Sequence, residues 1–213
     1  MSVILGFDTE TTGIPLWNDP SEDPRQPYIT ELAAKLVDEE TRKVVGSMNV
    51  LIKPEGWTIE EEAGAVTGIT VEDCQRYGVP LPQALEMFVA MWRKADLRAA
   101  HNEPFDNRIL RIAFKRDEIF SVEKVGGVDF ADYWKTAPRF CTQTNSTKIC
   151  MLPPTEKMVA KRMTGYKAPN LGEAYKFFTG RDMQGAHRAD ADVDAVLAVY
   201  FGIQDHNAKL DAK

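Results

Sequence analysis

The sequence feature that most constrains this chain is a short apolar run that ends in two carboxylates. The run covers residues 3–7 and leads into Asp8 and Glu10, after which Thr-Thr-Gly interrupts the pattern. An apolar run of this kind predicts a buried strand. Residues two apart in a strand point to the same face, so the two acids would converge at its end. Two buried acids repel each other, and a divalent cation would relieve that repulsion.

Two acids at this spacing are equally compatible with a solvated turn at the end of a strand, so the rest of the chain has to decide. The 213 residues are 44% hydrophobic and 27% charged, the composition of a soluble globular protein. No apolar run reaches the length of a membrane span, and the N-terminus lacks the features of a signal peptide. These observations predict a cytoplasmic protein with no membrane partner.

The sequence contains no internal repeat, low-complexity tract or linker. We therefore expect a single domain over residues 1–213, with a polar, frayed tail from about residue 205. The chain ends soon after its last motif, which favours a free-standing protein over one fused to a further enzymatic domain.

The cysteines and histidines make a zinc site or a disulfide framework a poor interpretation. Three cysteines occur without a CxxC pair, and the three histidines are scattered. Any metal would be held mainly by oxygen, which suits Mg²⁺ or Mn²⁺. The net charge of −6 argues against a general nucleic-acid binder but permits an enzyme that grips only the end of a strand.

Alternating and helical apolar patterns predict an α/β fold. Residues 28–37 and 43–52 flank a polar turn and predict a β-hairpin, although helix is an alternative for residues 30–36. Residues 17–27 form a polar, proline-rich loop, interpreted as a surface insertion in preference to a flexible flap. Further expected elements are helices at 59–66, 71–76 (capped by Thr70), from 82, from 104, at 170–178 (capped by Asn170, ended by Gly180) and at 191–203 (capped by Asp190), and strands at 95–100 and near 140–142.

Two further acids fall in the first turns of predicted helices, where the helix dipole favours an ionised carboxylate. These are Asp106 and Asp192, and His187 lies five residues before the second of them. A single aspartate in the first turn of a helix is usually there because it interacts favourably with the helix dipole. A single histidine just before a helix is usually a surface residue or a helix cap. Together with Asp8 and Glu10, they are the residue types that two-metal phosphoryl hydrolysis with a histidine general base requires.

The order and local sequence of these residues favour that functional interpretation. The segments FDTETTG, HNEPFD and HRADAD resemble the three motifs of the DEDD exonuclease superfamily, in its histidine-containing DEDDh branch. That branch includes the proofreading subunit of bacterial DNA polymerase III, ribonuclease T and oligoribonuclease. The resemblance spans residues 3–203 and implies a ribonuclease H-like fold, in which a mixed central sheet has its antiparallel strands first and helices on both faces.

The resemblance also implies a role for each motif residue. Asp8 would bridge two divalent cations, Mg²⁺ or Mn²⁺. Glu10 and Asp192 would hold the ion that activates water, Asp106 would reach the second ion, and His187 would take the proton of the attacking water. Two other acids, at positions 190 and 194, have no motif role and are interpreted as a helix cap and a solvated first-turn acid.

Substrate-binding candidates follow from the same resemblance and from local charge. Family members seat the terminal nucleotide with residues after the second motif acid, here Thr11 and Thr12, and Thr67 stands where many members have histidine. The second motif and the helix after it supply the others: His101, Asn102, Arg108 and Arg111. Two basic faces are candidates for holding the trailing phosphates: Arg108, Arg111 and Lys115, and Lys157, Lys161 and Arg162 with Lys167 nearby.

The preferred function is a two-metal 3′→5′ exonuclease that acts on single-stranded or mismatched DNA ends and releases nucleoside 5′-monophosphates. A 3′→5′ exoribonuclease of the ribonuclease T or oligoribonuclease type is the alternative, because the hydrolysed bond is the same. A non-catalytic module that binds nucleic-acid ends or a polymerase is less favoured. The expected partner is DNA, with RNA and a DNA polymerase as further candidates.

Overall fold

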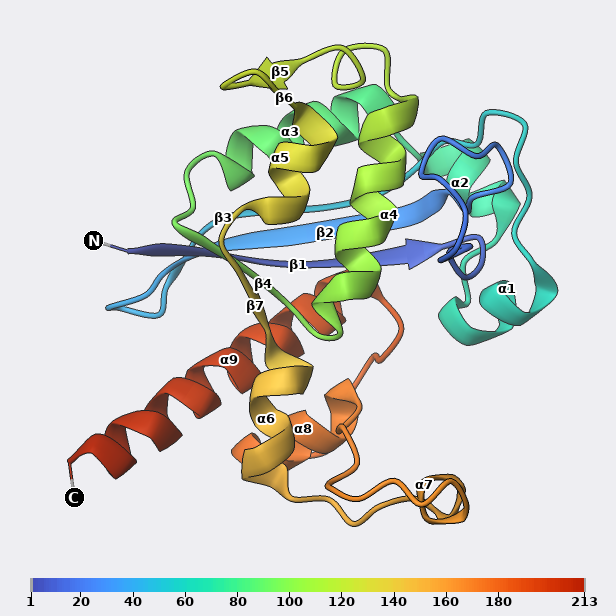
Figure 1. Cartoon of the computed structure of the whole chain (residues 1–213). Coiled ribbons are helices and arrows are strands. Elements are labelled where there is room, and N and C mark those ends of the chain that lie inside the picture. The colour runs from blue at the N-terminus through green and yellow to red at the C-terminus, as the bar shows by residue number, and fades with distance from the viewer. Residues whose placement is uncertain (1, 213) are drawn as a thin grey trace.

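A computed structural model describes residues 2–212 and contains a five-stranded sheet at its centre (Figure 1). The strand order is β3-β2-β1-β4-β7. The strands are β1 (Val3–Thr11), β2 (Ile29–Asp38), β3 (Val44–Leu51), β4 (Leu97–Ala100) and β7 (Arg139–Cys141). The first three are antiparallel, whereas β4 is parallel to β1 and to β7. The expected mixed sheet with its antiparallel strands first is therefore confirmed.

Helices cover both faces of this sheet (Figure 1). The helices on one face are α3 (Leu81–Trp92), α4 (Glu103–Arg116) and α5 (Phe130–Thr136). The other face carries α9 (Ala189–Asp211), against which α6 (Thr142–Cys150) and α8 (Leu171–Thr179) pack. The remaining elements are α1 (Glu61–Thr67), α2 (Val71–Tyr77), α7 (Glu156–Ala160) and the small hairpin of β5 (Lys124–Val125) and β6 (Val128–Asp129).

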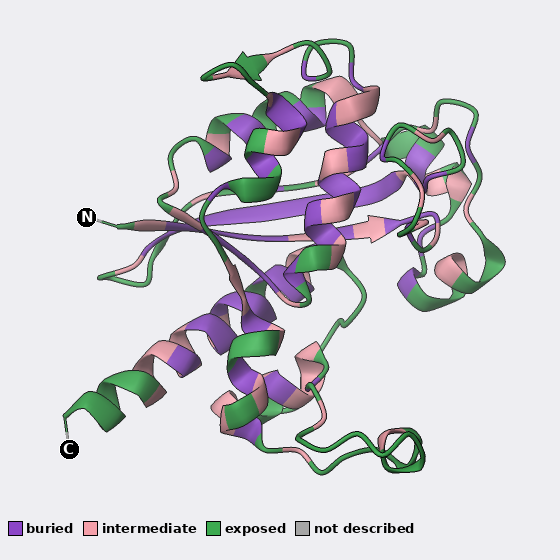
Figure 2. Ribbon diagram, viewed as in Figure 1, coloured by how far each residue is buried: buried purple, intermediate pink, exposed green. Residues whose placement is uncertain are grey.

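The helical alternative for residues 30–36 is wrong. All ten residues of β2 are buried, because the strand lies between β1 and β3 with helices over both faces (Figure 2). The two sides of a strand then both need apolar or paired side chains, which gives a run without strict alternation. The good helix formers in this run are overridden by that tertiary environment.

The alternation of β1 distributes its side chains between two cores. Phe7 packs edge-on against Phe88 and Trp134 on the α3 to α5 side. Ile4 belongs to the smaller core under α9. Gly6 also faces α9, where a Cβ would lie 2.8 Å from a side-chain carbon of Leu197. The missing side chain lets α9 pack directly on β1, and this brings the start of α9 close to the end of the strand.

Several expected helix ends are confirmed. The Thr70 side chain accepts from the backbone of Asp73, and Asn170 forms a capping box with Glu173. Gly180 ends α8 in the left-handed conformation that glycine adopts readily.

Helix α9 differs from the expectation at both ends. It begins at Ala189, so Asp190 lies within the first turn and caps nothing. Lys35 on β2 pairs with Asp190 at 3.0 Å and with Asp194 at 2.7 Å, so neither acid is merely solvated. The helix also continues to Asp211, and the prediction of a frayed tail from residue 205 is wrong. Arg42 pairs with Asp205 and helps to hold this last part.

The loop at 17–27 is packed against α4 and is not a plain surface insertion. Ser21 and Gln26 are each only 1% exposed. The side-chain amide of Gln26 accepts a hydrogen bond from the N–H of Leu16 at 3.0 Å and donates one to the carbonyl of Leu16 at 2.9 Å. The guanidinium of Arg116 donates to the carbonyls of Pro27 and Gln26 at 2.8 and 2.6 Å.

The cysteines agree with the expectation of reduced thiols, since Cys74, Cys141 and Cys150 are all free. Among residues 2–212, no helix combines the length and apolar character needed to cross a bilayer.

Candidate active site

The candidate site lies where β1 extends past its parallel neighbour. β1 pairs with β4 only from Ile4 to Gly6, so the last residues of β1 have no partner on that side. A cavity of about 340 Å³ opens there. Its lining residues are Asp8, Thr9, Glu10, His101, Asn102, Phe105, Asp106, Leu171, His187 and Asp192. The structure thus brings together all four predicted carboxylates and the predicted histidine.

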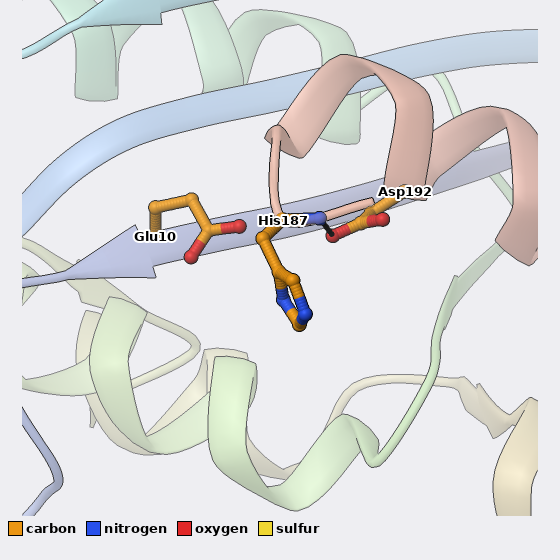
Figure 3. A group of neighbouring side chains, drawn as sticks. All are labelled: Glu10, His187 and Asp192. Atoms are coloured by element: carbon orange, nitrogen blue, oxygen red, sulfur yellow. Dashed lines mark hydrogen bonds between the residues drawn. The ribbon is translucent and has the colours of Figure 1, made fainter. Parts of the chain in front are cut away.

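Three of these side chains form the tightest group. Ligand atoms of Glu10, His187 and Asp192 all lie within 4.8 Å of one another. Figure 3 shows Glu10 on β1 and Asp192 on the first turn of α9, to either side of His187. Such a set of oxygen and nitrogen atoms fits a divalent cation. Sequence reasoning gave His187 the role of base and not of ligand, and its proximity to both acids is compatible with either role.

Asp106 reaches the site from α4, on the opposite face of the sheet from α9. Its Oδ1 accepts two hydrogen bonds from Thr9, from the backbone N–H at 3.0 Å and from the hydroxyl at 2.8 Å. Hydrogen bonds to a charged group contribute about 1.5–3 kcal/mol each. The unpaired edge of β1 therefore anchors Asp106 beside Asp8.

His187 stands in an unusual backbone conformation, with φ at 66°. The left-handed region costs a residue with a side chain roughly 1–2 kcal/mol, and such residues cluster at functional sites. Its backbone N–H donates to Asp192 Oδ2 at 3.2 Å, which offsets part of that cost. Within residues 2–212 the imidazole makes no hydrogen bond, and the side chain is exposed to the cavity.

A fifth carboxylate, Glu31, belongs to this region and was missed by sequence reasoning. It lies directly opposite Glu10 in the β1–β2 register and is 1% exposed. Arg188 neutralises it with hydrogen bonds of 3.1 and 2.8 Å, and the N–H of Ala189 donates to it at 3.0 Å. The available signal was an acid inside the apolar run at 28–37, because a charge buried in such a run needs a partner.

Burial raises the pKa values of all four acids, and repulsion between neighbouring carboxylates adds to the rise for Asp8 and Glu10. Burial, followed by the charges of Asp106, Asp192 and Glu10, raises the pKa of Asp8 well above its usual value. Burial and the charge of Asp192 raise the pKa of Glu10 to about 8. Burial also raises the pKa of Asp106 to about 7 and that of Asp192 to about 6. A site with this excess of negative charge fits divalent cations.

The predicted threonines shape a second cavity beside the first. About 260 Å³ in volume, it shares Glu10 and Phe105 with the carboxylate cavity and is also lined by Thr11 and Thr67. Thr11 donates to the carbonyl of Gly13 at 2.7 Å, and Thr67 donates to that of Ala63 at 3.1 Å.

Thr12 does not line this second cavity, and its hydroxyl accepts from the backbone N–H of Tyr28 at 3.0 Å. The structure therefore uses all three hydroxyls to hold local backbone.

His101 and Asn102 line the carboxylate cavity, but the ring of His101 is already engaged. Its Nδ1 lies 2.9 Å from the Thr142 hydroxyl, and its Nε2 lies 3.0 Å from the carbonyl of Pro169. A carbonyl only accepts, so Nε2 carries the proton, and burial lowers the pKa of the ring. Asn102 is exposed in a left-handed conformation at the start of α4.

Arg108 and Arg111 are not brought to the carboxylate cavity. They line a separate cavity of about 280 Å³ on another face of α4, together with Trp17. Both donate to the hydroxyl of Ser21, at 2.8 and 2.7 Å, and Arg111 also pairs with Asp132 at 2.7 Å. These guanidinium groups hold the 17–27 loop. The spacing of charges along the helix does not predict this contact, because Ser21 lies far away in the sequence.

A family model described as exonuclease, that of the ribonuclease T group, matches residues 5–200. The chain belongs to this exonuclease family. It is thereby a member of the DEDD superfamily, as the three motifs indicated. By its description, this is a family of nucleases, which are hydrolases that act on nucleic acids. No curated protein matches the sequence.

Solved structures of Escherichia coli exonuclease I share the fold of this exonuclease family member. The complex with a dA16 oligonucleotide is 19% identical with a TM-score of 0.68, over 96% of this chain and 41% of the other. The dT13 complex is 20% identical with a TM-score of 0.70, over 100% and 43%. A zinc-bound single-stranded DNA complex is 18% identical with a TM-score of 0.69, over 100% and 42%. The chain thus spans less than half of these proteins.

Proposed function

We propose that this protein is a metal-dependent 3′→5′ exonuclease of the DEDDh branch that removes nucleotides from single-stranded or frayed DNA ends. One observation carries the proposal. Four carboxylates from β1, α4 and α9, and His187 from the turn just before α9, line one cavity at the free end of β1. Their elevated pKa values support the binding of cations that would balance the charge.

Asp8, Glu10, Asp106 and Asp192 are the residues that would hold two divalent cations, Mg²⁺ or Mn²⁺. Such ions supply polarisation of the attacking water and of the leaving 3′ oxygen. His187 accepts the proton of that water, for which its imidazole is suited because it lies within 4.8 Å of the carboxylate of Asp192. Thr9 keeps Asp106 in place through its two hydrogen bonds.

The second cavity explains why a chain end would be attacked. It adjoins the carboxylates through Glu10 and Phe105, and the segment from Thr11 to Ile14 forms one of its walls. A terminal nucleotide fits such a side pocket, whereas a continuous strand would have to bend into it and out again. Unpairing and unstacking cost a few kcal/mol, so mismatched and single-stranded ends would be preferred. That preference would suit proofreading beside a DNA polymerase.

DNA is the proposed substrate because the exonuclease I structures that share this fold hold dA16 and dT13 oligonucleotides. The products would be nucleoside 5′-monophosphates. The cleaved bond is the same in RNA, so matched RNA belongs in the test.

The test uses 5′-labelled single-stranded DNA and RNA of one sequence, with Mg²⁺ and with excess EDTA. A descending ladder of labelled fragments that requires Mg²⁺ is expected, with DNA degraded faster than RNA. Immediate release of the labelled nucleotide, or cutting of circular single strands at the same rate, would refute the assigned polarity. Faster degradation of RNA would assign the chain to the exoribonucleases.

A further inference from the structure

Residues 151–167 form an arm that projects away from the body of the molecule and contains α7 (Figure 1). An antiparallel bridge between Leu152 and Lys167 joins its two ends, with a hydrogen bond of 3.0 Å. None of the residues in the arm is buried, and Figure 2 shows it almost entirely in the colour of exposed residues. The side chains of the arm therefore do not contribute to the hydrophobic core, and their types need another explanation.

The charge of the arm is opposite to that of the whole chain. It carries four basic residues and one acid, whereas the chain has a net charge of −6. Lys157, Lys161 and Arg162 are exposed, and within residues 2–212 no carboxylate lies within ion-pair distance of them. A polyanion would therefore be attracted to the arm more strongly than to the acidic remainder of the surface.

The other basic face of the sequence is engaged within the protein itself. Arg108 donates to the hydroxyl of Ser21 at 2.8 Å. Arg111 pairs with Asp132 at 2.7 Å, and Lys115 lies 3.3 Å from Glu22 and 3.5 Å from Asp129. Of the two clusters that the sequence presents as phosphate-binding candidates, the arm is the one in which three cations, Lys157, Lys161 and Arg162, have no such partner among the described residues.

The arm also exposes large apolar side chains between its charges. Val159 is 61% exposed, Met163 53% and Tyr166 47%. Single-stranded nucleic acid offers base faces that stack on aromatic and apolar side chains, whereas a duplex hides those faces. This alternation of cations and apolar groups therefore fits a single strand better than a duplex.

The root of the arm is fixed at the rim of the carboxylate cavity. Immediately after the arm, the carbonyl of Pro169 accepts from His101 at 3.0 Å and from Gln143 at 3.1 Å. Leu171, two residues further, lines the cavity itself. A strand with its end in the cavity can therefore pass from the rim onto the arm.

We propose that the arm at residues 151–167 holds the part of a single strand upstream of the hydrolysed end. Lys157, Lys161 and Arg162 contact phosphates, and Tyr166 and Met163 contact bases. This inference rests on the proposed function, because it takes the 3′ end to occupy the cavity of Asp8.

The test replaces the three free charges together, as Lys157→Gln, Lys161→Gln and Arg162→Gln. The matched control replaces three exposed lysines outside the arm, as Lys43→Gln, Lys53→Gln and Lys94→Gln. Each protein is assayed on a 20-nucleotide oligo(dT) and on the p-nitrophenyl ester of thymidine 5′-monophosphate, which is too short to reach the arm.

For the arm variant we expect the KM of the 20-mer to rise about 10-fold or more, with both kinetic constants for the ester unchanged. The slope of log(kcat/KM) against the logarithm of the salt concentration is negative, and each lost single-strand phosphate contact makes it less steep by about 0.7. Its magnitude should therefore fall by about 2. The control should match the wild type. Tyr166→Ala should weaken binding of the 20-mer about 5-fold or more, with no effect on blunt duplex.

If the arm variant has an unchanged KM and salt slope for the 20-mer, the proposal is overturned. The same holds if the arm variant and its control show the same rise in KM. An equal fall in kcat/KM for the ester would also overturn it, since the arm would then act through the cavity. If the wild type cleaves neither substrate, the proposed function fails on its own. Anisotropy of a fluorescent 20-mer in Mg²⁺ then decides the arm separately, and binding that the arm variant retains in full would overturn its role.

Discussion

Arg188 lies against the buried carboxylate of Glu31 and donates two hydrogen bonds to it, from Nε at 3.1 Å and from Nη2 at 2.8 Å. The N–H of Ala189 adds a third bond at 3.0 Å. These contacts fix the residue after His187 and the start of the helix that carries Asp192. Glu31 thus holds both functional side chains in place from β2.

Replacing Glu31 by Gln should therefore lower kcat with little change in KM. The amide keeps the shape of the side chain but leaves the Arg188 charge without its partner, so His187 and Asp192 lose their fixed position. A displacement of about 1 Å in a catalytic group costs roughly 10²-fold in rate. Steady-state kinetics on oligo(dT) measures the effect, and Lys35→Gln, which releases α9 at a different point, is the control. A wild-type kcat for Glu31→Gln would exclude the positioning role.

Replacing His187 by Ala distinguishes a base from a metal ligand. Loss of a general base should lower kcat roughly 10²–10⁴-fold. The Mg²⁺ concentration for half-maximal activity should stay the same, because the four carboxylates remain. Titration of activity with Mg²⁺ measures both quantities, with His206→Ala as the control. If that concentration rises about 10-fold or more, His187 is a ligand within the group it forms with Glu10 and Asp192.

The metal-free protein should lose stability as the pH rises from about 3.8, the ordinary pKa of an aspartate, to about 8, the pKa of Glu10 in the folded state. The folded pKa values of Glu10, Asp106 and Asp192 are about 8, 7 and 6, above their ordinary values. The folded state therefore binds more protons than the unfolded state in this window, and the stability present at low pH is lost as each group ionises. Thermal unfolding in EDTA should show Tm falling across the window, and Mg²⁺ should restore it most at the high end.

Asp8→Asn provides the matched variant for that experiment. Removing one charge from the repelling group should raise the Tm of the metal-free protein at pH 8 by about 2–4 °C, the shift that about 1 kcal/mol produces in a chain of this size. The variant should be inactive with Mg²⁺. A Tm that is flat between pH 5 and 8 in EDTA, for both proteins, would show that the carboxylates do not repel one another in the folded state.

Arg111→Ala should open the 17–27 loop and leave substrate binding unchanged. The substitution removes the 2.7 Å bonds to Ser21 and Asp132. Each bond from a charged donor contributes about 1.5–3 kcal/mol, so the loop should be cleaved by trypsin after Arg25 about 10-fold faster or more. Limited proteolysis followed by mass spectrometry measures the rate, with Lys124→Ala as the control. A large rise in KM for oligo(dT), without faster cleavage of the loop by trypsin, would show that Arg111 binds substrate.

The sequence by itself determined the elements of the site that depend on local pattern. The period of two in a strand placed Asp8 and Glu10 on one face, and the structure has both in β1. Asp106 and Asp192 lie in the first turns of α4 and α9, as the helix dipole favours. The order of the three motifs gave the family, which the exonuclease model confirms over residues 5–200.

Only the tertiary structure decided which charges are free and which are used. Arg108 and Ser21 are 87 residues apart in sequence, and Arg188 and Glu31 are 157 apart. No local period encodes such pairs, because they depend on which elements the fold places side by side. Such contacts make one basic face an anchor for the 17–27 loop and a strand glutamate a support for the segment that carries His187. In residues 2–212, Lys157, Lys161 and Arg162 of the arm have no carboxylate within ion-pair distance. Arg42 of the β2–β3 turn likewise pairs with Asp205 of α9, 163 residues away in the sequence, and the helix extends to Asp211.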